Sequence, residues 1–286
     1  MILQKIKYYL QIIKPGIVFG NLIPFSACFI FASDRNFKLN LFLLTFIGLF
    51  LVISGSCVCN NLIDIEIDKN MNRTKNRVLV RKKISIKNAI YYACFLLFIG
   101  FFILFYYVDH FSFFLSFLGF FIYVFLYSFI FKKKSTFSLF IGSISGAMPP
   151  IIGYYSSSKK INLIFFIFFL IFFLWQIPHF CSIAMFRIKD YKNAKIPILP
   201  LKKNIFFSTV FTSFFIILFT ICTSFLYFYD VLKLIYIIFF IIINFFWLLY
   251  ILLGYFYKNK KFFYISFLIS VLSNFMISLF ISYKNL

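Results

Sequence analysis

Three oxygen-bearing side chains recur at intervals of four residues: Asn60, Asp64 and Asp68, just after a long apolar segment (39–59). In a helix, which turns by about 100° per residue, these positions stay within roughly 80° of one another and share one face. Two carboxylates and an amide oxygen form a site of hard oxygen ligands, which suits Mg²⁺ better than zinc. The spacing therefore predicts that Asn60, Asp64 and Asp68 hold a metal and act as the catalytic centre.

Two arginines, Arg73 and Arg77, repeat the four-residue spacing just beyond this motif. Guanidinium groups complement phosphate oxygens in charge and in geometry. Acidic side chains, Mg²⁺ and arginines at a membrane face together predict a substrate that carries a diphosphate and whose other end belongs in lipid. The alternative is that these are ordinary polar residues of a solvated loop.

A second polar group follows later in the chain. His179, one of two histidines, closes the segment Trp175-Gln176-Ile177-Pro178-His179. A histidine in a membrane helix is costly without a role or a partner, and haem-iron ligand, proton acceptor and hydrogen-bond donor all remain open. Lys189 and Asp190 follow it and could supply a second contact to metal or phosphate.

The elements that position these residues are membrane helices. The chain of 286 residues is 63% hydrophobic, with a mean hydropathy of +0.99, more than a soluble domain can bury. Apolar runs of about 20 residues span a bilayer. We expect an all-α polytopic membrane protein with nine transmembrane helices around a central cavity. The predicted spans are 16–33, 39–59, 88–108, 111–131, 137–156, 161–183, 206–229, 231–256 and 262–282. Small residues and prolines dilute the fifth span, 137–156, so that a kink is expected there.

The net charge of +22 could suggest a nucleic-acid partner, but the distribution of the charge argues for a membrane instead. In the nine-span arrangement, 23 of the 29 basic residues fall on the side of the N-terminus and six on the other. The positive-inside rule then predicts a cytoplasmic N-terminus and an external C-terminus. Lys132-Lys133-Lys134 is interpreted as a topology anchor, and residues 1–15 as an amphipathic segment along the cytoplasmic surface. We expect one integral-membrane domain over residues 1–286, with catalytic loops at 60–87 and 184–204 on the cytoplasmic side of a bacterial inner membrane.

The motif Asn60-x-x-x-Asp64-x-x-x-Asp68 after the second of nine spans resembles the intramembrane prenyltransferases of the 4-hydroxybenzoate polyprenyltransferase superfamily. The wider strings are similar to its protohaem IX farnesyltransferase branch. They are Asp68-Lys69-Asn70-Met71-Asn72-Arg73-Thr74-Lys75-Asn76-Arg77, Gly146-Ala147-Met148-Pro149-Pro150-Ile151-Ile152-Gly153, the Trp175–His179 segment, and Asp190-Tyr191 with Ile196-Pro197-Ile198-Leu199-Pro200. The likeness is collinear from about Lys14 to Pro200, and beyond Pro200 only the number of spans supports it.

The resemblance implies that farnesyl diphosphate and haem B react, with addition of water, to give haem O and diphosphate. It implies that Asn60, Asp64 and Asp68 hold Mg²⁺ on the diphosphate, and that Arg73, Arg77 and Lys189 neutralise the leaving group. His179 is the residue carried over to haem binding. Haem B is a substrate rather than a cofactor, and a haem A synthase or a terminal oxidase is the protein partner that this chemistry suggests.

The sequence departs from the superfamily at the second acidic motif, because Asp190 is followed by Ala194 where a second aspartate is common. One Mg²⁺ with basic contacts is therefore expected. The alternatives are a prenyltransferase of the same fold that acts on an aromatic quinone precursor, a membrane transporter, and a structural subunit of a respiratory complex. A transporter would carry its charged residues near the middle of the bilayer. A structural subunit would tolerate Asp64→Asn.

Overall fold

Long apolar helices build the protein. The computed structural model describes residues 2–34 and 36–283, and within these ranges every regular element is a helix. Eight of the helices are long and apolar enough to cross a membrane, which confirms an all-α polytopic membrane protein. They are α2 (Pro15–Ser33), α3 (Leu39–Ile63), α5 (Ile86–Ile103) with its π-helical continuation (Leu104–Val108), α6 (His110–Phe121) with its π-helical continuation (Ile122–Phe131), α9 (Leu163–Phe186), α12 (Ile205–Phe228), α13 (Leu234–Phe256) and α14 (Lys260–Ser282).

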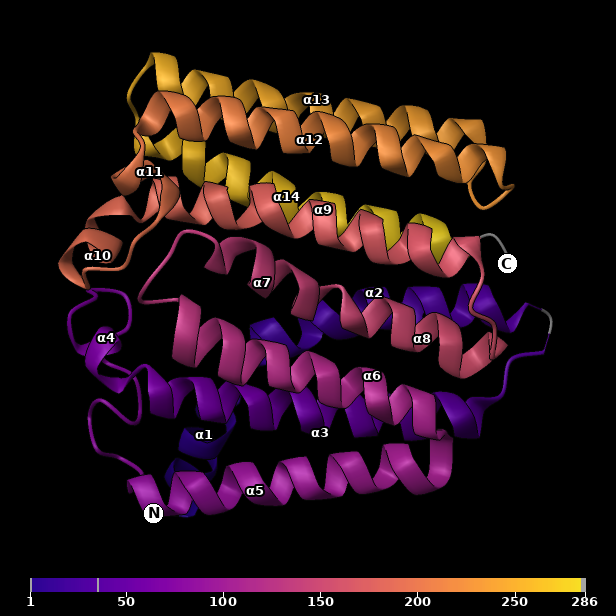
Figure 1. Cartoon of the computed structure of the whole chain (residues 1–286), viewed down its shortest axis with the longest axis horizontal. Coiled ribbons are helices and arrows are strands. Elements are labelled where there is room, and N and C mark those ends of the chain that lie inside the picture. Colours follow the sequence, from indigo (N-terminus) through magenta and orange to yellow (C-terminus); the bar gives the residue numbers. More distant parts are fainter. Residues whose placement is uncertain (1, 35, 284–286) are drawn as a thin grey trace.

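The fifth predicted span, 137–156, is not one continuous helix. It consists of α7 (Ser138–Gly146) and α8 (Met148–Ser158), which follow one another end to end across the bundle (Figure 1). Pro149 and Pro150 stand in the first turn of α8. Backbone N–H groups have no partner within the helix in a first turn, so the N–H that proline lacks is not missed there. Each half is shorter than the roughly 20 residues that a spanning helix needs. Eight of the nine predicted spans are therefore found as long helices. The fifth is replaced by the two shorter helices α7 and α8.

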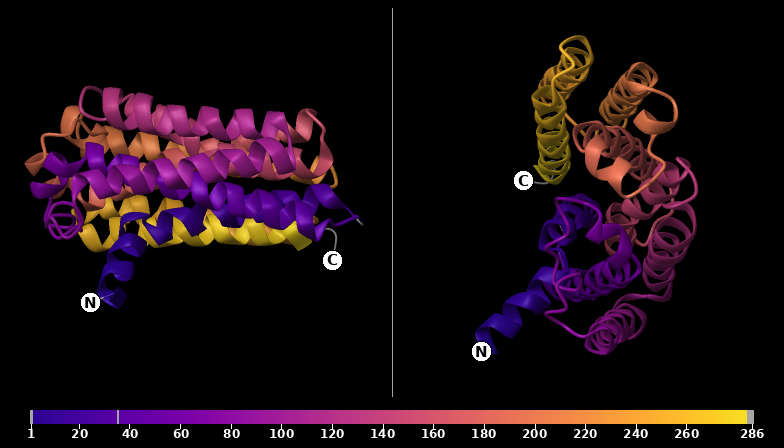
Figure 2. Two further views of the ribbon diagram at one scale, coloured as in Figure 1. Left: turned by 90° about the horizontal axis from the view of Figure 1, so that it is seen from below. Right: turned by 90° about the vertical axis from the view of Figure 1, so that its left-hand side faces the viewer.

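Short helices gather at one end of the bundle. They are α4 (Ile65–Lys69), α10 (Ile188–Asn193) and α11 (Leu199–Lys202), at the left of Figure 1. The segments that carry the predicted catalytic loops thus meet at the same end, although about 120 residues separate them. The N-terminal helix α1 (Ile2–Ile12) projects sideways from the bundle near this end (Figure 2).

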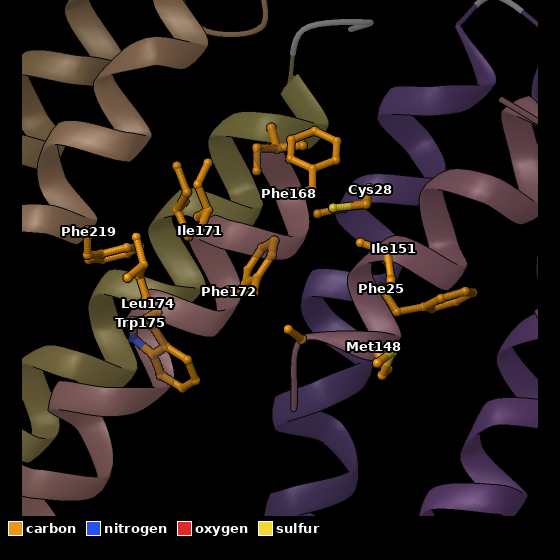
Figure 3. Close-up of a cluster of buried hydrophobic side chains, with 14 of the residues drawn as sticks. Phe25, Cys28, Met148, Ile151, Phe168, Ile171, Phe172, Leu174, Trp175 and Phe219 are labelled. Atoms are coloured by element: carbon orange, nitrogen blue, oxygen red, sulfur yellow. The ribbon is translucent and has the colours of Figure 1, made fainter. Parts of the chain in front are cut away.

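The apolar core runs through the bundle and includes the space between α2, α8 and α9. Figure 3 shows Phe25 and Cys28 of α2 near Ile151 of α8 and Phe168 and Phe172 of α9, and these side chains are buried. The outward surfaces of the long helices are also apolar, with phenylalanine, leucine and isoleucine widely exposed. A surface this apolar is what a lipid environment requires.

A cavity of about 220 Å³ lies between α2, α3 and α14. Its lining is almost wholly apolar and includes Leu22 and Ile23 of α2, Phe46 of α3 and Phe275 of α14. The first and last long helices therefore leave room for hydrocarbon between them.

Candidate active site

The three metal-site residues keep their helical register across a change of element. Helix α3 ends at Ile63 and α4 begins at Ile65, yet the backbone amide of Asp64 donates to the carbonyl of Asn60 (3.0 Å). The amide of Asp68 likewise donates to the carbonyl of Asp64 (2.8 Å). The four-residue spacing that placed these side chains on one face is therefore present. All three are buried, with exposed fractions of 2–3%.

Asn60 and Asp64 are each contacted by a lysine. The Asn60 amide accepts a hydrogen bond from Lys14 Nζ and donates one to Ser128 Oγ (2.9 Å). Asp64 Oδ2 forms an ion pair with Lys132 Nζ. The other carboxylate oxygen, Asp64 Oδ1, is buried and has no hydrogen-bond partner. A buried carboxylate oxygen without a partner is costly unless a cation or a donor joins it.

Asp68 is held by Arg77. The Arg77 guanidinium lies 2.7 Å from Asp68 Oδ2 and also donates to Asn61 Oδ1 (3.3 Å). The backbone carbonyl of Asp68 accepts the hydroxyl hydrogen of Thr74 (3.2 Å). The loop after α4 is thereby folded back over the acidic motif. It presents a buried carboxylate beside a guanidinium that is 27% exposed.

The second predicted loop reaches the same place. Asp190 is 7% exposed, and its Oδ1 accepts the backbone N–H of Asn72 (3.1 Å). Ile67, Met71 and Ile196 form a small apolar cluster between the two loops. Asp190 therefore joins the loops, while Lys189 and Arg73 are exposed to solvent.

Tyr191 lies where the two loops meet. Burial raises the pKa of the Tyr191 phenol, and the charges of Lys132 and Arg73 act in the opposite direction. A cavity of about 70 Å³ beside the acidic site has Lys132, Tyr127 and Tyr191 in its lining. The acidic motif is thus bordered by a space with a positive charge and two phenol rings.

Two lysines of this site were not singled out from the sequence as site residues. The sequence favours a topology anchor at Lys132, yet Lys132 forms an ion pair with Asp64. Lys14 precedes Pro15 at the entrance of α2, and its backbone is left-handed (φ 56°), which directs the chain into that helix. Burial lowers the pKa of Lys14 to about 8, and the charge of Arg77 adds to this effect. Both lysines stand at the end of a span on the side of the acidic motif, which is the signal that could have identified them.

His179 contacts α14. Its Nδ1 lies 2.7 Å from Ser270 Oγ, and its ring stacks on Trp175 with centroids 4.6 Å apart. The Trp175 indole donates to the Ser270 carbonyl (2.8 Å), and Ser270 Oγ donates to the Phe267 carbonyl (2.5 Å). Because a hydroxyl has a single hydrogen, Ser270 must accept from His179. This assigns the proton to Nδ1 and leaves Nε2 with its lone pair.

The donor set fits Mg²⁺ when a diphosphate completes it. Among the described residues, no three His, Cys, Asp or Glu side chains come together as a metal cluster. Two carboxylates and the Asn60 amide do lie on one helical face, all buried, and one carboxylate oxygen there is unpartnered. Mg²⁺ is commonly bound by one or two carboxylates with the remaining ligands from phosphate and water. These residues could therefore hold the ion only jointly with a phosphate-bearing substrate.

Comparisons with known proteins find relatives over most of the chain. The UbiA prenyltransferase family matches residues 21–278. Protoheme IX farnesyltransferase of Protochlamydia amoebophila is 41% identical over 244 residues, 85% of this chain and 86% of that protein. The Cronobacter sakazakii protein of the same name is 39% identical over 256 residues, 90% of this chain and 87% of its own length.

Solved structures share the fold at lower identity. One described as digeranylgeranylglyceryl phosphate synthase superposes with a TM-score of 0.79 at 19% identity and covers 99% of each chain. A UbiA homolog from Archaeoglobus fulgidus, bound to GPP and Mg²⁺, superposes with a TM-score of 0.66 at 16% identity and covers 96% of this chain and 99% of its own. With its buried Asn-Asp-Asp face and with relatives this similar over most of its length, the chain belongs to the UbiA prenyltransferase family, among the protoheme IX farnesyltransferases.

Proposed function

We propose that the protein transfers a farnesyl group from farnesyl diphosphate to a vinyl group of haem B, with addition of water, giving haem O and diphosphate. The observation that carries this proposal is the unpartnered, buried Asp64 Oδ1 beside Asn60 and Asp68, in a chain whose relatives are named for this reaction. The site offers oxygen ligands and positive charge, and it does not need a nucleophilic serine or cysteine because the haem vinyl group supplies the electrons.

Asn60, Asp64 and Asp68 are the residues that would hold Mg²⁺, which when bound supplies positive charge to the diphosphate. Lys14, Lys132 and Arg77 already contact these side chains. On substrate binding their charges face the diphosphate and stabilise the negative charge that the departing group gains. Arg73 and Lys189 are exposed on the same two loops, where they attract the anionic substrate and contact its outer oxygens. Asp190 acts through the Asn72 amide by holding the loops together.

The bond between the allylic carbon and the diphosphate oxygen breaks, and its electron pair leaves with the diphosphate. The π electrons of the haem vinyl group form the new carbon–carbon bond to the farnesyl carbon. Water then adds to the cation left beside the porphyrin and loses a proton, so that a hydroxyl group remains. Aromatic rings such as Tyr123 and Tyr127, which stack 5.7 Å apart near Lys132, suit a cationic intermediate and exclude water from it.

His179 is the proposed haem contact. With Nδ1 bonded to Ser270, the imidazole offers Nε2 as an unprotonated ligand for haem iron. Such a ligand would fix the position of the porphyrin and hence of its vinyl group. This is a positioning role, because the iron does not take part in the bond changes above.

We further propose nine crossings of a bacterial inner membrane within one domain, with α7 and α8 together as the fifth. The N-terminus and the loops with α4 and α10 would face the cytoplasm, and the C-terminus the outside. The excess of basic residues on the side of the acidic motif supports this orientation. The product would pass to a haem A synthase or to a terminal oxidase.

The decisive experiment supplies membranes containing the protein with haem B, farnesyl diphosphate and Mg²⁺, and then separates the extracted haems by chromatography and mass. We expect a haem carrying a hydroxyethylfarnesyl group, and we expect chelation of Mg²⁺ to abolish it. If haem B were returned unchanged while a phenolic acceptor was prenylated, the acceptor would be a quinone precursor and the haem proposal would be wrong.

A further inference from the structure

Helix α1 has an apolar face that no part of the described chain covers. Leu3, Ile6 and Leu10 lie on one side of this helix and are 83%, 49% and 54% exposed. The C-terminal end of the helix is packed: Ile12 is 2% exposed, and the Tyr9 ring lies 5.0 Å from that of Tyr92 on α5. The helix is therefore anchored to the bundle by its C-terminal end, and its projecting part presents these three apolar side chains on one side.

The direction of α1 matches a membrane surface. In Figure 2 it leaves the bundle sideways, at a steep angle to the long helices, near the end that holds α4. The long helices run along the membrane normal, so α1 extends in the plane of the membrane at its boundary. An amphipathic helix with this orientation buries its apolar face at the boundary between headgroups and acyl chains.

Positive charge surrounds this helix. Lys5 and Lys7 lie on α1 and are exposed. The neighbouring segment 81–87 contributes four more exposed basic residues, and its Ile84 packs into the same apolar cluster as Ile12. These four residues are Arg81, Lys82, Lys83 and Lys87. Among the described residues, none of the six basic side chains forms an ion pair with an acidic group. Unpaired basic residues beside an interfacial apolar face attract anionic lipid headgroups.

The inner end of α1 is joined to the candidate active site. Asn61 Nδ2 donates to the carbonyl of Ile12 (2.7 Å), and Asn61 Oδ1 accepts from Arg77, the partner of Asp68. Two residues beyond Ile12, Lys14 contacts Asn60. The position of α1 therefore affects the contacts that Lys14 makes with Asn60 and that Asn61 makes with Arg77.

We propose that α1 and the segment 81–87 form a binding surface for anionic lipid headgroups, and that lipid bound there holds Lys14 and Asn61 in place at the site. The effect on turnover rests on the proposed function. The binding of lipid does not.

The test reconstitutes the full chain in vesicles of phosphatidylcholine alone and of phosphatidylcholine with phosphatidylglycerol in equal parts. Hydrogen–deuterium exchange of the α1 amides is measured in both. We expect exchange at least tenfold slower with phosphatidylglycerol, because each basic residue near an anionic surface strengthens binding by about fivefold. Equal exchange in the two vesicles would overturn the proposal. So would protection that rises with protein density instead of phosphatidylglycerol, because that would assign the face to a second copy of the chain.

Two variants and a control locate the effect. Lys5→Gln with Lys7→Gln should remove most of the slowing, and Leu3→Ser with Ile6→Ser and Leu10→Ser should speed exchange in both vesicles. Lys260→Gln with Lys261→Gln removes two exposed lysines at the start of α14 and should behave as wild type. Inorganic phosphate added to phosphatidylcholine vesicles should not reproduce the slowing. If it does, the surface recognises phosphate and not a membrane.

Turnover is followed in the same vesicles. We expect haem O formation several-fold faster with phosphatidylglycerol for wild type and for the Lys260/Lys261 control, and no such gain for the Lys5/Lys7 variant. Protection that responds to lipid without any change in turnover would overturn the link to the site. A third outcome is that phosphatidylglycerol slows exchange of the α1 amides but no vesicle yields haem O. That result would establish lipid binding and contradict the proposed function.

Discussion

At Asp64, one carboxylate oxygen holds Lys132 and the other is buried without a partner. Replacing this residue by asparagine keeps the shape and removes the charge. We expect Asp64→Asn to lower the rate of haem O formation by about 10²–10³-fold, a size typical for the loss of one group that stabilises charge at a reacting centre. The matched control is Glu66→Gln, because Glu66 lies two residues further on, in α4, but is exposed and forms an ion pair with Lys69. Comparable activity of Asp64→Asn and Glu66→Gln would contradict the metal–diphosphate assignment.

The hydrogen bond between Ser270 and His179 leads to a second prediction. Ser270→Ala removes the acceptor that keeps the proton on Nδ1. We expect haem affinity to fall by roughly 10–100-fold, as is usual when the partner that orients a ligating histidine is lost, with a shift in the haem absorption spectrum. Affinity for farnesyl diphosphate should not change. Ser266→Ala is the control, since Ser266 lies one turn away and bonds Ser182 instead. An unchanged haem spectrum in Ser270→Ala would end the role proposed for His179.

Local spacing predicted part of the site and long-range packing supplied the rest. Asn60, Asp64 and Asp68 could be grouped from the sequence because a helix fixes which neighbours share a face. Lys14 and Lys132 could not be added to this group from the sequence. Lys14 is 46 residues from Asn60, and Lys132 is 68 residues from Asp64. Basic residues at span ends are also common for topology alone. Only the fold distinguishes a lysine at the active site from a topology anchor.

Among the elements, α2 and α8 approach closely at one glycine. A Cβ on Gly153 would lie 2.2 Å from the backbone carbonyl oxygen of Phe25, which cannot rotate away. We expect Gly153→Ala to destabilise the protein by about 1–3 kcal/mol through overpacking. Gly20→Ala on α2 is the control, because nothing lies within 4 Å of its Cβ position. Thermal unfolding in detergent compares the two. A melting temperature of Gly153→Ala equal to that of Gly20→Ala would show that α2 and α8 lie farther apart.

The N-terminal end of α6 carries a pH-dependent cap. Burial would raise the pKa of Asp109, but hydrogen bonds from Lys159 and Ser112 outweigh it and hold that pKa below its ordinary value of 3.8. The stabilisation is therefore fully present above pH 3.8 and is lost as pH falls through the lower pKa of the folded state. We expect Asp109→Ala to cost about 1 kcal/mol at neutral pH, as loss of an N-cap usually does. In thermal melts, the difference from wild type should shrink on acidification. A constant difference at every pH would contradict the cap.

The break in the fifth span shows that a hydropathy pattern does not determine whether an apolar segment forms one helix or two. Gly142, Gly146 and the proline pair indicated an irregular helix, and the sequence predicts a kink there. It did not predict that Ala147 separates two helices. The reason is that a chain interrupted within the bundle needs neighbours to satisfy its backbone, and those neighbours, α2, α6 and α9, come from other parts of the sequence.

For the whole molecule, the distribution of basic residues predicts which membrane face the acidic motif occupies. The connection between α13 and α14 lies at the same end of the bundle as α4, and the connection between α8 and α9 lies at the opposite end (Figure 1). Lys260 and Lys160 mark these two ends, and both are exposed. Because 23 of the 29 basic residues fall on the side of Lys260, that side should be cytoplasmic.

Cysteines introduced at these two positions report the orientation directly. In intact bacterial cells a membrane-impermeant maleimide should label Lys160→Cys and should label Lys260→Cys only after the inner membrane is permeabilised. The wild-type chain, whose Cys94 is exposed on α5, gives the background for both variants. Labelling of Lys260→Cys in intact cells would place Asp64 and its loops outside, where no cytoplasmic pool of farnesyl diphosphate could reach them. Because the proposed reaction draws its diphosphate substrate and Mg²⁺ from the cytoplasm, that single result would contradict the orientation and the reaction scheme together.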